Sequence, residues 1–333
     1  MDPLTQGVIG AALPQSFSKK KFVSVAGLFG FFSGIVADLD MFIRSTDDPL
    51  LYLEFHRQFT HSLIFIPIGG VICSVFFFLI LGKRWEISFK QSVLFCTLGY
   101  ATHPLLDACT SYGTMLLWPF SYERISWDNI SIIDPLFTIP ILILILIAGF
   151  KKKQIFARIA LTWVILYLTL GIVFRNSVIE IGKEIAVSRG HTPLRLKAEP
   201  SFGNIFLWKI IYENSGMYYV DAVRTVPSFK ILSGESIQKL NIASSFPWLD
   251  MDSQQAKDIE RFRWFSNDYL AQDKVHKNRI IDIRFSKIPN RITPLWSIEL
   301  FENASFDKHV IYNRHRNLSD NRFSLLWEML WSK

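Results

Sequence analysis

Residues 62–81 read SLIFIPIGGVICSVFFFLIL, without a charged side chain, and residues 155–174 read IFARIALTWVILYLTLGIVF, with only one. Each stretch has about the length that a helix needs to cross a hydrocarbon core roughly 30 Å thick. Residues 132–149 and 22–37 are shorter stretches of the same kind. Helices buried in soluble proteins are rarely this apolar over several consecutive segments. The sequence therefore predicts membrane-spanning helices and disfavours a soluble protein.

The basic residues lie in the short gaps between these apolar segments. The chain is 50% hydrophobic and has a net charge of +7. Three gaps carry most of the positive charge near the segments: Lys19, Lys20 and Lys21; Lys83, Arg84 and Lys90; and Lys151, Lys152, Lys153 and Arg158. Short basic loops fix the orientation of membrane helices. The basic residues are not interleaved with aromatic ones as on a nucleic-acid surface, so we expect no nucleic-acid partner.

Placing the three basic gaps in the cytoplasm gives a consistent thread through the membrane. The segments alternate in direction: 22–37 outward, 62–81 inward, 91–108 outward, 134–149 inward and 155–174 outward. Residues 3–17 precede them and contain a proline. Fifteen residues make a helix of only about 22 Å, so this first segment either spans or lies half-buried at the interface.

The remainder of the chain has the pattern of a soluble domain. Residues 205–213 and 217–225 are rich in β-formers and predict a hairpin around Asn214-Ser215-Gly216. Residues 251–270 indicate a helix, and two further strands are expected at 279–286 and 294–301. The predicted fold class is mainly α. A polytopic helical membrane domain of five to six apolar helices covers 1–175, and a soluble, extracytoplasmic α+β domain covers 176–333.

Histidine and aspartate residues fall at the non-cytoplasmic ends of the predicted helices: Asp38, Asp40, His56, His61, His103, Asp107 and Asp134. Lysine and arginine alone set the topology, so this convergence is a separate indication of a site. His103 and Asp107 are four residues apart and share one helix face. Imidazole and carboxylate groups together suit zinc, manganese or iron, and several carboxylates permit two ions. Ionisable groups at membrane depth are costly and mark function.

Several of these residues also have a purely structural interpretation. Asp38 or Asp134 can cap a helix end. Arg57 can bind an anionic substrate or pair with Asp47 or Asp48. The stretch 110–113, Thr-Ser-Tyr-Gly, is either a turn after a helix or part of a pocket.

The same residues lie in motifs that identify a family. These motifs are Met1-Asp2-Pro3-Leu4-Thr5, Ala37-Asp38-Leu39-Asp40, His56-Arg57-Gln58-Phe59-Thr60-His61-Ser62, His103-Pro104-Leu105-Leu106-Asp107, Leu117-Trp118-Pro119-Phe120 and Ile133-Asp134-Pro135. Over about residues 1–150, and weakly beyond, the chain resembles the YdjM-like family of bacterial inner-membrane, metal-dependent hydrolases. The resemblance implies a membrane-embedded hydrolase with a divalent metal, and the His/Asp pattern is similar to that of zinc-dependent phospholipases C. Family members commonly carry Thr-His where this chain has Thr5-Gln6.

Together these observations predict a membrane-bound, metal-dependent hydrolase at the outer face of the bacterial inner membrane. Its substrate is expected to be an ester or phosphodiester of lipid-like character, and membrane lipids are the expected partners. The expected ion is zinc, with manganese or iron as alternatives. The expected ligands are Asp38, Asp40, His56, His61, His103 and Asp107, with Arg57 and Asp134 in catalytic roles.

Two other functions remain open from the sequence. One is a non-catalytic envelope or regulatory protein with a structural metal site, since ligand residues look alike in closed and open sites. The other is a cation transporter, which requires ionisable groups near the middle of the membrane. The sequence does not predict an oligomeric state.

Overall fold

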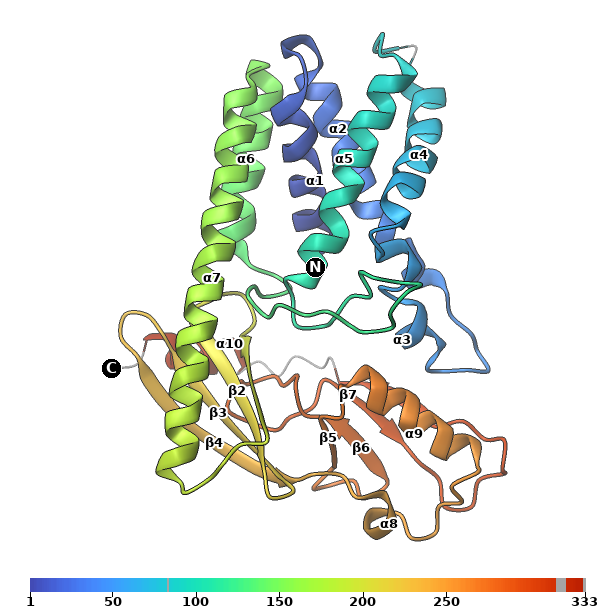
Figure 1. Ribbon diagram of the computed structural model, residues 1–333, viewed down its shortest axis with the longest axis vertical. Coiled ribbons are helices and arrows are strands. Elements are labelled where there is room, and N and C mark those ends of the chain that lie inside the picture. Colours follow the sequence, from blue (N-terminus) through green and yellow to red (C-terminus); the bar gives the residue numbers. More distant parts are fainter. Residues whose placement is uncertain (83, 316–321, 332–333) are drawn as a thin grey trace. The chain divides into compact units, whose positions relative to one another are not determined.

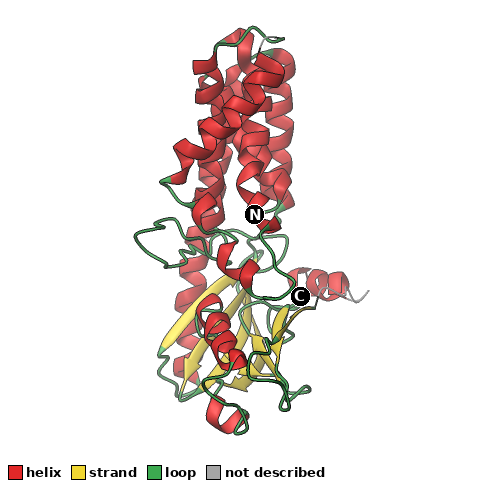
Figure 2. Ribbon diagram, turned by 90° about the vertical axis from the view of Figure 1, so that its right-hand side faces the viewer, coloured by secondary structure: helices red, strands yellow, loops and turns green. Residues whose placement is uncertain are grey.

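The computed structural model describes residues 1–82, 84–315 and 322–331. The chain divides into two compact units. One comprises Met1–Ile43, Phe55–Val173 and Phe202–Ile205, and the other Arg44–Glu54, Phe174–Ser201 and Phe206–Lys333. The first unit is a bundle of helices (Figure 1), and the strands drawn in Figure 2 belong to the second.

The apolar segments of the sequence are all helical in the first unit. The helices are α1 (Pro3–Phe17), α2 (Val23–Val36), α4 (Phe65–Phe77), α5 (Phe89–Ala108), α6 (Pro135–Lys151) and α7 (Gln154–Ser188), with the short turns η1 (Lys20–Phe22), η2 (Ala37–Phe42), η3 (Phe59–His61) and η4 (Phe78–Gly82) between them. Within the described residues, three helical stretches are long and apolar enough to cross a membrane: Lys20–Phe42, Phe65–Gly82 and Gln154–Ser188. Five to six spans are therefore not confirmed.

Helix α1 lies inside the bundle, packed against its neighbours, and eleven of its fifteen residues are buried. Glycines allow this close approach. A Cβ atom on Gly10 would lie 2.5 Å from the carbonyl oxygen of Gly30, and one on Gly34 would lie 2.8 Å from that of Gln6. A Cβ on Gly99 of α5 would lie 2.5 Å from the Cα of Gly30. Small residues at such contacts are how membrane helices pack closely.

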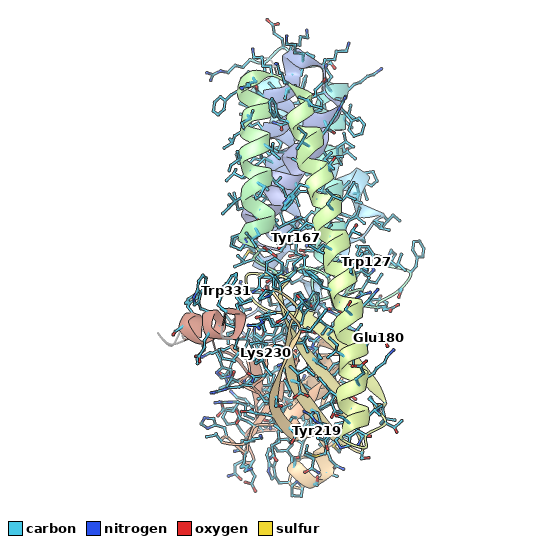
Figure 3. All side chains as sticks on the ribbon, turned by 90° about the vertical axis from the view of Figure 1, so that its left-hand side faces the viewer. Trp127, Tyr167, Glu180, Tyr219, Lys230 and Trp331 are labelled. Carbon is cyan, nitrogen blue, oxygen red and sulfur yellow. The ribbon has the colours of Figure 1, made fainter. Side chains whose placement is uncertain are left out.

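Helix α7 is continuous across the boundary predicted at residue 175. Its 35 residues make a helix of about 52 Å at 1.5 Å per residue, longer than the hydrocarbon core. Figure 3 shows Tyr167 and Glu180 along this one helix. The apolar pattern ends near residue 174, but helical backbone hydrogen bonding continues through a polar segment.

The described part of the second unit contains two four-stranded antiparallel sheets. The first has the order β1 (Arg195–Pro200), β2 (Leu207–Asn214), β3 (Met217–Arg224), β4 (Lys230–Gln238), and the second β5 (Leu270–Gln272), β6 (Arg279–Asp282), β7 (Trp296–Glu299), β8 (Ile311–Arg314). The helices of this unit are α3 (Leu51–Phe55, of which Phe55 falls in the first unit), α8 (Ile242–Ser245), α9 (Gln254–Phe265) and α10 (Arg322–Trp331).

The elements predicted for the second unit form, but the helix and the two later strands are shorter than predicted: α9 ends at Phe265, β6 at Asp282 and β7 at Glu299. Strands β2 and β3 form the predicted hairpin, with Asn214 opposite Met217. Ser215 and Gly216 both have positive φ, 49° and 74°, which is the backbone of a type I′ turn that matches strand twist. Residues 44–54 also belong to this unit, which the sequence did not predict. Arg261 of α9 holds them there, because it binds Asp48 at 2.7 Å and also pairs with Glu54.

Candidate metal centre

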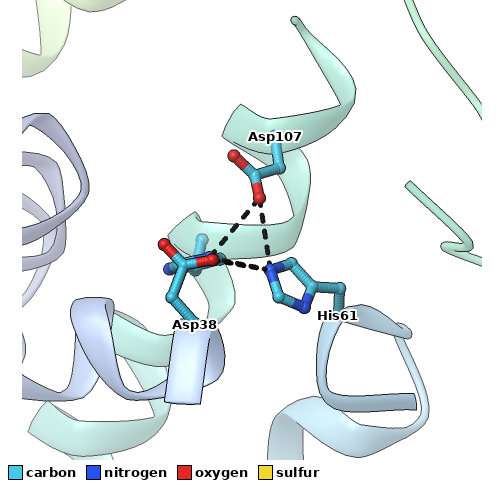
Figure 4. A group of neighbouring side chains, drawn as sticks. Asp38, His61 and Asp107 are labelled. Carbon is cyan, nitrogen blue, oxygen red and sulfur yellow. Dashed lines mark hydrogen bonds and ion pairs between the residues drawn. The ribbon is translucent and has the colours of Figure 1, made fainter. Parts of the chain in front are cut away.

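Four side chains from three segments of the first unit converge at one point. Asp38 comes from η2 after α2, His61 from η3, and His103 and Asp107 from the last turns of α5. One ligand atom from each of the four lies within 4.8 Å of the others. Figure 4 shows Asp38, His61 and Asp107 pointing toward one another. The side chain of Asp38 is 16% exposed, whereas the other three are fully buried.

The distances among these atoms match the coordination sphere of a small divalent ion. The Nε2 atoms of His61 and His103 are 2.9 Å apart. Asp38 Oδ1 is 3.4 Å from each of them, and Asp107 Oδ2 is 3.2 Å from the first and 3.5 Å from the second. Ligands about 2.0–2.1 Å from zinc in a tetrahedron are about 3.3–3.4 Å from each other. The four atoms therefore need only small shifts to hold one ion.

The other nitrogen of each imidazole is held by a group outside the cluster. His103 Nδ1 lies 2.6 Å from the carbonyl oxygen of Gly34, and a carbonyl only accepts, so this nitrogen donates. His61 Nδ1 is 3.1 Å from Asp40 Oδ2. In their neutral forms both rings therefore present a lone pair at Nε2. Metal-binding histidines are typically fixed in this way by a carbonyl or a carboxylate.

The cluster attracts positive charge. Burial acts to lower the pKa of His61, but its contacts with Asp107, Asp38 and Asp40 outweigh burial and raise the pKa to about 10. Two imidazole lone pairs and two carboxylates that point at one another are stable only with a cation or a proton between them.

Asp40 is surrounded by hydrogen-bond donors. Its Oδ2 accepts from the backbone N–H of Arg57 at 3.0 Å and from Thr60 Oγ1 at 2.7 Å, as well as lying beside His61. Its Oδ1 is 2.7 Å from His56 Nδ1. Asp38, Asp40 and His56 form a second group with ligand atoms within 4.8 Å of one another. Asp38 thus belongs to both groups.

Arg57 is buried against the cluster, with 3% of its surface exposed and φ of 65°. Its Nε is 3.0 Å from Asp107 Oδ2, and its Nη1 donates to Thr110 Oγ1 at 3.0 Å. The sequence left open a pair between Arg57 and Asp47 or Asp48. Instead the guanidinium pairs with Asp107. Thr110 lies in the turn after α5 and also accepts a hydrogen bond from the same guanidinium.

Comparison with known proteins supports the sequence motifs. Residues 1–178 of the 333 match the family model described as YdjM inner membrane protein. The chain belongs to this family. Inner membrane protein YbcI of Escherichia coli (strain K12) is 38% identical over 72 residues, which make up 21% of this chain and 39% of that protein. The chain therefore covers well under two thirds of that relative. No solved structure matches the chain.

In this YdjM family member, the side chain of Gln6 contacts the candidate metal centre. Its side chain is fully buried, and its Nε2 donates to Asp107 Oδ1 at 2.9 Å. The terminal amino group of Met1 contacts the same oxygen. Gln6 Oε1 is buried without a hydrogen-bond partner among the described residues. The position where the resemblance expects histidine therefore adjoins Asp107, one of the candidate metal ligands.

Asp134 has the contacts of a helix cap, one of the alternatives that the sequence left open. Its Oδ1 accepts from the backbone N–H groups of Leu136 and Phe137 at 3.2 and 3.3 Å, and its Oδ2 accepts from Tyr167 at 2.7 Å. It is not part of either His/Asp group within the described residues.

Sequence reasoning missed the groups that orient the ligands. The carbonyl of Gly34 accepts from His103, Thr60 donates to Asp40, and Tyr100 donates to the carbonyl of Thr60 at 2.7 Å. Thr60 lies between His56 and His61 in the sequence motif, so its role could have been predicted. The carbonyl of Gly34 and the side chain of Tyr100 in the middle of α5 are not marked by any sequence pattern.

Proposed function

We propose that this YdjM family member is a membrane-bound, metal-dependent hydrolase that cleaves an ester or phosphodiester in a lipid-like substrate. The observation that carries the proposal is the convergence of two imidazole Nε2 atoms and two carboxylate oxygens, with both Nδ1 atoms held elsewhere. Divalent ions bound by such groups supply a nucleophile at neutral pH and polarise a carbonyl or phosphoryl oxygen. Zinc suits the imidazole and carboxylate set, and manganese or iron are the alternatives.

The site is proposed to hold two ions that share Asp38. His61, His103 and Asp107 would hold the first, and Asp40 and His56 the second, with Asp38 between them. The side chains of Asp38 and His56 are 16% and 13% exposed, more than the other ligands, so substrate is expected to approach from their side. Two ions held by these residues would stabilise both the attacking and the leaving oxygen of a hydrolysed substrate.

Arg57 is proposed to contribute a fixed positive charge. Its guanidinium positions Asp107 and lies beside the cluster, where it can attract an anionic part of the substrate. We assign no catalytic role to Asp134, because its carboxylate oxygens already cap α6 and accept from Tyr167.

The predicted topology supports a lipid substrate. We propose that α1, α2, α4, α5, α6 and the first part of α7 all cross or enter the membrane, with the metal ligands at headgroup depth on the outer side. The C-terminal unit would then be extracytoplasmic, as the basic loops predict. A reporter fused after Lys333 that is active only in the cytoplasm would reverse this orientation.

The hydrolase is tested with purified full-length protein in nanodiscs loaded with zinc or manganese. Phospholipids labelled in the headgroup or at the acyl ester report which bond breaks. Hydrolysis should require the metal and disappear in His103→Ala but not in His276→Ala, an exposed histidine of the second unit. Metal-dependent turnover that survives in His103→Ala would reject this site.

A structural metal site is the competing function, and one observation favours it. Four protein ligands can close the coordination of one zinc ion, as in structural sites. That alternative predicts one tightly bound ion per chain, a large loss of thermal stability on chelation and no hydrolysis of any labelled lipid.

A further inference from the structure

The first unit contains a groove between α1, α2 and α6 that includes none of the candidate metal ligands. Its volume is about 370 Å³, and its walls are formed by α1, α2 and α6, including Leu28, Phe31, Ile145 and Leu146. Ligand pockets have volumes of about 300–1,000 Å³. Asp38 follows the C-terminal end of α2, whereas Ser24 of the groove lies in its first turn. The groove therefore lies toward the opposite end of α2 from the metal centre.

One polar group in this apolar groove lacks a partner. Gln15 lines the groove and is 4% exposed. Its Nε2 donates to the carbonyl oxygen of Ile145 at 3.3 Å, but its Oε1 is buried without a hydrogen-bond partner among the described residues. Buried acceptors are almost always satisfied in native proteins. A donor on a bound molecule would satisfy this one.

Two lysine clusters lie at the same end of the bundle. The first, residues 19–21, links α1 to α2, and the second, residues 151–153, ends α6 and leads into α7. The two links are in contact, because the side chain of Gln154 donates to the carbonyl oxygen of Ser18 and Arg158 Nε donates to that of Ser16 at 3.3 Å. Among the groove residues, Phe150 directly precedes the second cluster, and Ser24 lies three residues after the first.

These lysines have no acidic neighbours along the chain. All six are exposed, and the described residues provide no ion pair for any of them. The sequence has no aspartate or glutamate from residue 3 to 37 or from 135 to 179. Basic loops that only set topology need neither a groove nor an unsatisfied amide beside them. Basic pockets between membrane helices are typical binding sites for anionic lipid headgroups.

We propose that this groove binds one anionic phospholipid, with an acyl chain against the apolar walls and the phosphate between the two lysine clusters. A headgroup with hydroxyl donors, as in phosphatidylglycerol, would in addition satisfy the oxygen of Gln15 once that buried side chain rotates toward the groove. This lipid site is independent of the hydrolase proposed above, because it shares no residue with the metal centre.

The test compares phosphatidylglycerol with phosphatidylcholine of the same acyl chains, added to the full-length protein in neutral detergent. Native mass spectrometry counts the retained lipid, and a thermal shift measures stabilisation, which grows with lipid concentration over Kd. We expect one phosphatidylglycerol to be retained with at least tenfold preference over phosphatidylcholine. Equal retention of the two lipids, or binding of a second copy of the chain in place of lipid, would overturn the proposal.

Two variants locate the binding. Gly149→Leu should fill the groove and reduce retention of phosphatidylglycerol about tenfold. A Cβ at this position has its nearest neighbours at 3.7 and 4.0 Å, and leucine is a better helix former than glycine, so the variant should fold. Lys20→Gln with Lys151→Gln should remove the preference for phosphatidylglycerol, whereas Lys274→Gln, an exposed lysine of the second unit, should not. Unchanged retention and preference in the first two variants would reject the site.

Discussion

Replacing Asp40 with asparagine tests how the centre is organised. Asparagine can keep one oxygen where Oδ2 accepts from Arg57 N, Thr60 Oγ1 and His61 Nδ1, and turn its amide toward His56, whose ring can change tautomer to accept. The fold should therefore survive. The substitution removes the negative charge beside the Nδ1–H of His61. That charge makes the Nε2 atom of His61 a stronger metal ligand, so metal affinity should fall.

The size of the effect follows from that role. Loss of a group that orients a ligand typically costs about 10–100-fold in metal affinity, or about 1.4–2.7 kcal/mol. Competition with a chelator of known affinity measures the constant, and elemental analysis measures the number of ions per chain. Asp221→Asn is the matched control, since Asp221 is a buried carboxylate of the second unit paired with Arg189 at 2.7 Å. It should lower stability but leave metal affinity unchanged.

Two results bear on this role of Asp40 in different ways. Unchanged metal affinity in Asp40→Asn would refute it, because His61 would then not depend on Asp40. A loss of one whole ion per chain, with the remaining ion bound about 10–100-fold more weakly, would show that Asp40 also holds the second ion of the proposed two-ion site.

Three further predictions follow from the contacts of single residues. Metal binding should release about one proton per chain near pH 7, because ligation displaces the proton that the raised pKa of His61, about 10, retains; calorimetry in buffers of different ionisation enthalpy measures it, and zero release would contradict the cluster. Arg57→Ala should lower both melting temperature and metal affinity, since breaking a buried pair with Asp107 at 3.0 Å costs about 3–5 kcal/mol; a melting temperature equal to wild type would show that Asp107 does not need this arginine. Burial lowers the pKa of Lys209 from 10.5 to about 8, so the unfolded chain binds this proton more tightly and the free energy of unfolding should rise between about pH 8 and 10.5. In Lys209→Met that rise should be smaller, as measured by denaturant unfolding at several pH values, and an identical pH profile would exclude Lys209 as its source.

The sequence predicted the elements that local patterns determine. Apolar runs gave the helices, and Asn214-Ser215-Gly216 gave the hairpin because few residue pairs suit two consecutive positive φ values. The sequence also predicted that histidine and aspartate residues meet, and six of the seven lie in the two His/Asp groups, whereas Asp134 does not. The family resemblance, first seen in motifs of residues 1–150, is confirmed and extends to residue 178.

Other features of the structure could not be predicted, because they depend on side-chain orientation and on contacts between distant residues. The sequence pattern determines neither. Asp38 and Asp40 are two residues apart, yet one oxygen of Asp38 faces the cluster while Asp40 binds surrounding donors. The attachment of residues 44–54 to the second unit depends on Arg261, more than two hundred residues away. The position of α1 inside the bundle depends on close glycine contacts with α2, and α2 in turn meets Gly99 of α5.

Those glycine contacts have a consequence for the evolution of this family. Gly30, Gly34 and Gly99 fix the separation of α2 and α5, and these helices lead to or carry the ligands Asp38 and His103. Backbone pressed against backbone leaves no flexible side chain to absorb a change. A mutation that enlarges one of these glycines therefore moves a ligand, although it touches no metal. With the proposed metal site, we expect lineages that keep the candidate ligands to keep these glycines as well, and lineages that lose the ligands to vary at the glycine positions.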